Sequence, residues 1–94
     1  MYYARDRETA ERVLLELRAA RTMDEPALTL PRLQRIRNEV ACENAADRPR
    51  LMAWMSIRKL YDACKVTPGR DLKPLWAEAI ANTSAWSESL RVGR

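Results

Sequence analysis

The fold is decided by residues 51–66, which read LMAWMSIRKLYDACKV. Wound as a helix of about 3.6 residues per turn, this segment carries apolar side chains around most of its circumference. These side chains are Leu51, Met52, Trp54, Met55, Ile57, Leu60, Tyr61 and Cys64. A helix of this kind lies in the centre of its domain or is enclosed by a partner. We therefore expect it to form the core around which the rest of the chain packs.

Two helices are expected before this segment. The first begins after Asp6, a good N-cap residue, and runs to about Arg21. The second is capped by Thr29, with Pro31 in its first turn, where a missing N–H group costs nothing. Apolar residues follow one side of each helix at helical spacing, which predicts that both lie against the core with the other side in solvent.

Cap residues also mark the starts of the central helix and of a fourth helix. Asp47, followed by Pro49, precedes the central helix, and Asp71 precedes the last one. Apolar residues keep to a single face over residues 72–90, which favours one long helix, although the polar stretch at 82–84 could divide it into two. Short connections favour antiparallel neighbours. We expect an all-α fold, a compact four-helix bundle, with residues 1–94 as a single helical domain.

The composition is that of a soluble globular protein. Of the 94 residues, 47% are hydrophobic and 32% charged, and only two are glycine. No apolar run approaches the roughly 18 residues of a membrane span, and the N-terminus lacks the apolar core of a secretory signal. From the natural Met start and the caps toward both ends, we expect a whole small reading frame. We expect a cytoplasmic protein that makes no membrane contact. Its two cysteines, Cys42 and Cys64, are expected to be reduced and partly buried.

The sequence argues against catalysis. It contains no histidine, which removes the commonest general base and the commonest transition-metal ligand. Two isolated cysteines cannot complete a zinc site, and no phosphate-binding loop is present, so we expect no metal and no cofactor. Asp62 lies in a mainly apolar helix and could serve acid–base chemistry, or could pair with Arg58 one turn away, and we favour the pairing. We expect that the protein is not an enzyme.

Positive charge is concentrated in residues 48–73. Seven cations face only Asp62 and Asp71 there, which is 7 − 2 = +5, whereas the whole chain carries +4. The cations are Arg48, Arg50, Arg58, Lys59, Lys65, Arg70 and Lys73. This segment is therefore the best candidate for a surface that meets an acidic partner.

Two aromatic and two basic residues alternate along one strip of the central helix. Trp54, Arg58, Tyr61 and Lys65 are spaced so that they line up on its surface. Such a strip could stack on the bases of a single-stranded nucleic acid, or bind an acidic groove of a protein. The alternative is that both aromatic rings pack into the core and the cations only cover apolar surface.

The leading hypothesis is a small regulatory or inhibitory protein that acts by protein–protein contact, such as a phage or mobile-element product that blocks a host nucleic-acid machine. Direct nucleic-acid binding by the same surface is the alternative, and a structural subunit of a homo-oligomer is a third. Leu15, on a charged helix face, is expected to be an exposed association spot, as are Met52 and Met55. The residues expected to bind a partner are Trp54, Arg58, Tyr61, Lys65, Arg48, Arg50, Arg70, Lys73 and Leu15.

Overall fold

The computed structural model contains four helices. They are α1 (Tyr2–Arg21), α2 (Pro26–Val40), α3 (Arg48–Val66) and α4 (Lys73–Val92). The structure describes residues 2–22, 26–66 and 71–92, and the side chains of residues 6–22, 29–66 and 71–90. No strand occurs in these ranges, and the fold is an all-α four-helix bundle, as predicted.

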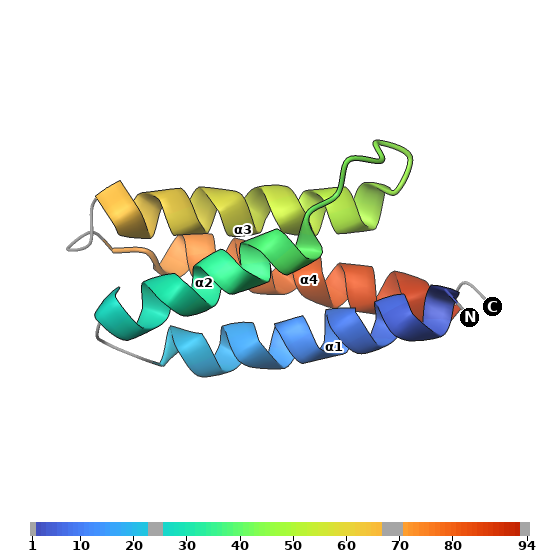
Figure 1. The fold of residues 1–94 in the computed structure, drawn as a ribbon, viewed down its shortest axis with the longest axis horizontal. Coiled ribbons are helices and arrows are strands. Elements are labelled where there is room, and N and C mark those ends of the chain that lie inside the picture. The colour runs from blue at the N-terminus through green and yellow to red at the C-terminus, as the bar shows by residue number, and fades with distance from the viewer. Residues whose placement is uncertain (1, 23–25, 67–70, 93–94) are drawn as a thin grey trace.

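Successive helices run antiparallel, so both chain termini lie at one end of the bundle (Figure 1). Each helix packs against the one that precedes or follows it, and α4 closes the bundle by packing against α1. The diagonal pairs, α1 with α3 and α2 with α4, have no close backbone approach in the described part of the chain. The prediction that α3 forms the centre is therefore wrong, because the centre is a shared core of side chains.

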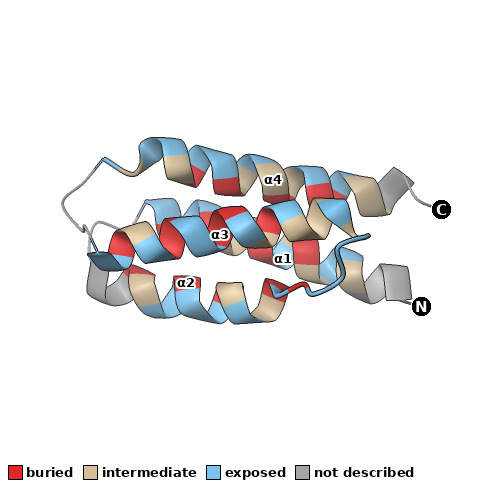
Figure 2. Ribbon diagram, turned by 90° about the horizontal axis from the view of Figure 1, so that it is seen from above, coloured by how far each residue is buried: buried red, intermediate tan, exposed pale blue. Residues whose placement is uncertain are grey.

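The core receives side chains from all four helices. Figure 2 colours the buried residues red, and they alternate with exposed residues along the helices. The largest fully buried residues are Trp86, Leu17, Leu33, Ile36, Ile57, Leu60, Val13, Val40 and Thr83. Only one side of α3 contributes to this core, so the remaining apolar residues of that helix lie at the surface. A helix at the corner of a bundle has two neighbours at most, and they cannot cover its whole circumference.

The expected caps of the first two helices are wrong. Asp6 lies inside α1, and Thr29 is a buried residue inside α2. The second helix begins at Pro26, where a proline needs no N–H donor, so Pro31 lies in the helix interior. Both helices therefore begin before the residues whose side chains give the local cap signals, so these signals did not decide the helix starts.

The expected starts of α3 and α4 are confirmed. The carbonyl of Asp47 accepts the first helical bond of α3, from the N–H of Leu51 at 3.0 Å. The carboxylate of Asp71 accepts a bond of 3.1 Å from the N–H of Lys73, the first residue of α4. The fourth helix runs unbroken, and Thr83, within its polar stretch, is buried in the core.

Candidate functional site

The solvent side of α3 is a mixed apolar and basic surface, which we name the α3 face. It consists of the exposed residues Arg48, Met52, Met55, Arg58, Lys59, Asp62, Lys65 and Val66. Met52 is 45% exposed and Met55 is 53% exposed, so the predicted exposure of both methionines is confirmed. Four cations against one carboxylate give the α3 face a net charge of 4 − 1 = +3.

Most cations of the α3 face have no counter-charge among the residues that the structure describes. Lys59 is the exception, with its Nζ atom 3.7 Å from Oε1 of Glu78 on α4. No carboxylate among the described residues forms an ion pair with Arg48, Arg58 or Lys65. The charge of these three cations is therefore open to an external anion.

Trp54 borders the α3 face without belonging to it. Its indole ring is half-buried and packs against the core, and the guanidinium carbon of Arg58 lies 4.8 Å from the ring centroid. The indole N–H is buried and has no acceptor among the described residues. Arg58 therefore stacks on Trp54, and the expected pair between Arg58 and Asp62 is not formed. Asp62 itself is exposed, so it is a solvated carboxylate beside the cations.

The prediction that Tyr61 presents its ring to solvent is wrong. The residue is only 9% exposed and belongs to the core cluster. The guanidinium carbon of Arg37, on α2, lies 4.8 Å from the Tyr61 ring centroid. Because Arg37 lies on α2, which packs against α3, this contact covers the Tyr61 ring from the α2 side. The expected strip of two open aromatic rings is reduced to the half-buried Trp54.

Arg50 belongs to the fold rather than to the surface. Its guanidinium donates to the carbonyls of Val40 (3.1 Å), Glu39 (3.3 Å) and Ala41 (3.3 Å) at the C-terminal end of α2. These carbonyls have no intrahelical donor, and a cation there also complements the helix dipole. Arg50 was expected to bind a partner, but its donors are already engaged.

Arg50 also joins the other two helices. Its Nη1 atom lies 3.8 Å from Oδ1 of Asp6 on α1, and its guanidinium carbon lies 5.3 Å from the ring centroid of Trp86 on α4. One side chain of α3 therefore contacts all the other helices or their ends. This role depends on the tertiary arrangement and could not be found from local spacing.

The remaining predicted residues are spread over the molecule. Arg48 and Lys65 are exposed at opposite ends of α3, and Lys73 is exposed at the start of α4. Arg70 lies outside the described residues. Leu15 is 66% exposed, as predicted, but it lies on α1, diagonally across the bundle from α3, so it is not part of the α3 face.

Sequence reasoning missed Arg37 as a neighbour of this site. The residue follows the buried Ile36, and it extends from α2 toward α3 with its guanidinium over Tyr61. No described carboxylate forms an ion pair with Arg37, so it adds another positive charge beside the Tyr61 ring. Its position at the edge of the apolar stripe of α2 was the only available signal.

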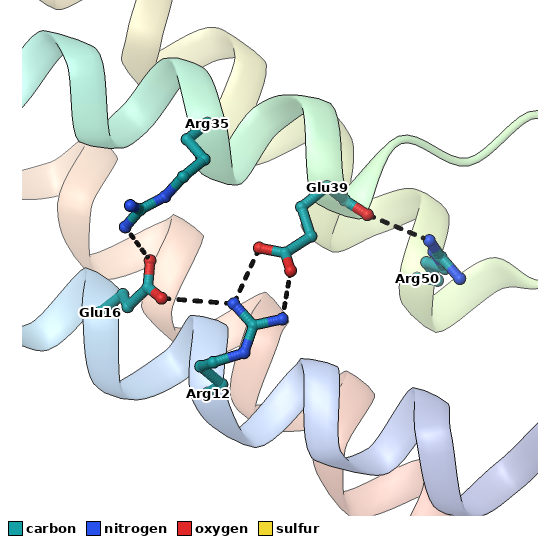
Figure 3. A network of polar contacts seen from close by, with 5 residues as sticks. All are labelled: Arg12, Glu16, Arg35, Glu39 and Arg50. Carbon is teal, nitrogen blue, oxygen red and sulfur yellow. Dashed lines mark hydrogen bonds and ion pairs between the residues drawn. The ribbon is translucent and has the colours of Figure 1, made fainter.

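A second polar cluster joins α1 to α2, and its groups are paired with one another (Figure 3). Arg12 donates to both carboxylate oxygens of Glu39 and, at 3.3 Å, to Glu16. Arg35 donates to the other oxygen of Glu16 at 2.9 Å. Two guanidiniums and two carboxylates cancel in charge, so this cluster connects two helices and has no unpaired group with which to bind or activate a substrate.

The Arg12–Glu39 pair makes stability depend on pH. The hydrogen bonds from Arg12 lower the pKa of Glu39 from its ordinary value of 4.5. A carboxyl group whose pKa is lower in the folded state than in the unfolded state stabilises the fold at pH values above its unfolded-state pKa. This stabilisation is lost as the pH falls through its folded-state pKa. We expect the wild type to lose more stability than Glu39→Gln between about pH 6 and about pH 3, by less than about 1 kcal/mol because the pair is partly exposed.

Urea denaturation at a series of pH values measures this difference. Glu43→Gln is the matched control, because Glu43 is exposed and forms no ion pair within the described residues. Equal pH dependence of Glu39→Gln and the wild type would contradict the proposed role of the pair.

No reactive centre is assembled in the described part of the chain. Burial raises the pKa of the Cys64 thiol, which disfavours the nucleophilic thiolate. Cys42 is also buried, and its sulfur lies 3.4 Å from the carbonyl oxygen of Asn44. The described residues contain no group of three or more potential metal ligands. None of the described helices is long and apolar enough to cross a membrane.

Comparison with known proteins gives no family: no family model matches this chain, nor does any curated protein or solved structure. The chain's own surfaces are therefore what indicates its function. Two of them are distinctive, the α3 face and the outer side of α1.

Proposed function

We propose that this protein is a small non-catalytic regulatory or inhibitory domain whose α3 face binds an acidic protein partner. The observation that carries the proposal is the proximity of two exposed methionines to cations that have no counter-charge within the described chain. Methionine adapts its shape to an apolar partner surface, and arginine recognises carboxylates. The expected partner surface is acidic, with an apolar centre that covers Met52 and Met55.

The geometry favours a protein over a nucleic acid. Binding of single strands relies on open aromatic rings, but Tyr61 is buried and Arg58 covers part of Trp54. An exposed methionine side chain makes no favourable contact with a phosphate backbone. In protein interfaces, by contrast, apolar contacts at the centre with charged residues around them are typical. The +3 charge then selects an acidic partner and accelerates its approach.

The chemical state of the thiol and carboxyl groups in the described residues supports a non-catalytic role. The buried thiol of Cys64 is held away from its reactive form, and the clustered carboxylates of α1 and α2 are paired with arginines. A domain of this kind acts by occupying the surface of another molecule.

Charge reversal on the α3 face tests the proposal. We expect Arg58→Glu/Lys65→Glu to reduce capture of the partner from lysate of the source cell at least about tenfold, because like charges replace complementary ones. Nuclease-treated lysate, quantitative mass spectrometry and a tagged bait provide the measurement. Both residues are exposed, so the helical CD signal and Tm should remain close to those of the wild type.

Two further variants, used as baits in the same way, show whether the loss of the partner is specific to the α3 face. Arg21→Glu/Arg32→Glu is the matched control, because it reverses the same number of exposed cations away from the α3 face and should retain the partner. Met52→Ser/Met55→Ser should lose a protein partner through loss of apolar contact. A partner that is retained equally by all the variants does not bind the α3 face.

Direct nucleic-acid binding predicts a different pattern. If about four cations neutralise phosphates, the logarithm of the association constant falls linearly with the logarithm of the salt concentration, with a slope of about −3 to −4. Such binding would survive Met52→Ser/Met55→Ser and would appear in gel shifts with random oligonucleotides. That combination would replace the protein partner by a nucleic acid.

A further inference from the structure

The outer side of α1 carries a second exposed surface, separate from the α3 face. Glu8, Glu11, Leu15 and Arg18 follow one another at intervals of three and four residues, which is the spacing of a helix–helix seam. Glu8, Leu15 and Arg18 are exposed, and Glu11 is half-buried. Leu15, the apolar residue of the seam, is 66% exposed.

The charges of this seam are arranged to match its own copy. Both carboxylates precede Leu15, and Arg18 follows it. When a second α1 lies antiparallel, with the two-fold axis near Leu15, the acidic half of each helix faces the basic end of the other. Glu11 then meets Arg18 of the second copy, and this contact occurs twice because the interface is isologous.

The pairs already present on α1 are compatible with this contact. Glu11 accepts a bond of 3.3 Å from Arg7 one turn earlier, but this is a surface pair of small energy, and a carboxylate has acceptor sites for more than one donor. Arg18 forms no ion pair with any described carboxylate. Arg12, which follows Glu11 directly, is bound to Glu39.

The seam also borders a recess in which apolar and polar side chains are mixed. A shallow groove of about 430 Å³ lies between α1 and α4. It is lined by Glu11, Leu14, Leu15, Arg18, Ser84, Ser87 and Glu88. The two serines of α4 are short, so a helix that lies over α1 can insert its own Leu15 beside Leu14 and Leu15 without displacing a bulky side chain.

We propose that this chain forms an antiparallel homodimer through α1, with the two Leu15 side chains at the centre and reciprocal Glu11–Arg18 pairs on either side. A second copy fits this surface better than the α3 face, because two α3 faces of charge +3 repel each other. A one-helix interface belongs to the smallest class of specific contacts, so we expect micromolar affinity. The diagonal placement of α1 and α3 leaves both α3 faces accessible in the dimer.

Sedimentation equilibrium of the whole chain tests this proposal. The wild type should pass from monomer to dimer between about 1 µM and about 1 mM, and Leu15→Ser should weaken dimerisation at least about tenfold without altering the CD spectrum. Val66→Ser is the control, because Val66 is 76% exposed on α3 and should leave the dimer unchanged. A wild type that stays monomeric throughout, or a dimer that Leu15→Ser leaves intact, overturns the proposal.

A charge swap identifies the pairing itself. Glu11→Arg gives a seam rich in cations and Arg18→Glu gives a seam of carboxylates, so each variant alone should dimerise at least about tenfold more weakly than the wild type. Their equimolar mixture should form a heterodimer, because the guanidinium introduced in one variant then faces the carboxylate introduced in the other, with affinity within about threefold of the wild type. If the mixture remains monomeric, or if either variant alone dimerises like the wild type, the antiparallel α1 pairing is wrong.

Discussion

Replacement of Trp86 by alanine is expected to lower the free energy of unfolding by about 3–5 kcal/mol, the largest effect of any single change considered for this chain. The Trp86 side chain is only 1% exposed and lies in the core cluster shared by all four helices. Its removal leaves a cavity that a small bundle cannot close, and Arg50 loses the ring on which its guanidinium lies. Urea denaturation followed by far-UV circular dichroism measures the loss.

Trp54→Ala is the matched control for this prediction. The same atoms are deleted, but the ring is half-buried and its buried indole N–H has no acceptor among the described residues. Its loss should therefore cost about half as much or less, since an unsatisfied buried donor is itself unfavourable. If Trp54→Ala destabilises the protein as strongly as Trp86→Ala, the core is not where the structure places it.

Replacement of Arg50 by methionine is expected to cost about 2–3 kcal/mol, because charged hydrogen bonds to otherwise unpaired carbonyls are among the stronger polar contacts. Methionine retains an apolar side chain of similar reach and removes the guanidinium. The carbonyls of Glu39, Val40 and Ala41 then lose their donor, and Asp6 loses its partner. Chemical denaturation again measures the change.

Arg48→Met and Arg50→Lys separate this role from the effect of charge alone. Arg48 lies two residues earlier on the same helix and is exposed, so its substitution should change stability by less than about 0.5 kcal/mol. Lysine at position 50 keeps the charge but has no planar fork, so it should recover only part of the loss. Equal effects of Arg48→Met and Arg50→Met would contradict the connecting role of Arg50.

The two proposed surfaces divide the molecule between two kinds of contact. The α3 face carries net positive charge beside exposed methionines and suits a different, acidic molecule. The seam of α1 carries both signs of charge, one on each side of Leu15, and suits its own copy. A dimer formed through α1 would present two α3 faces, which would strengthen attachment to a partner with repeated acidic sites.

Local patterns in the sequence were sufficient to predict the helices and the exposure of isolated apolar residues on their surfaces. The apolar periodicity predicted four helices and favoured one long fourth helix over two, and Asp47 and Asp71 marked two of the helix starts. Leu15 stands among charged residues on its own helix, and this sufficed to predict its exposure. These properties depend on neighbours within one or two turns, which the order of residues specifies directly.

The burial and the pairing of longer side chains were decided by the tertiary structure. Local spacing places Tyr61 and Trp54 in one strip, but the position of α2 buries Tyr61 and leaves Trp54 half-buried. Helical spacing likewise predicts that Arg50 is one more surface cation. In the folded chain, however, the turn between α2 and α3 brings the backbone carbonyls of Glu39, Val40 and Ala41 within hydrogen-bond distance of its guanidinium. The physical reason is that periodicity defines the face of a helix on which a residue lies, whereas the burial of that face depends on how distant segments pack together in the folded chain.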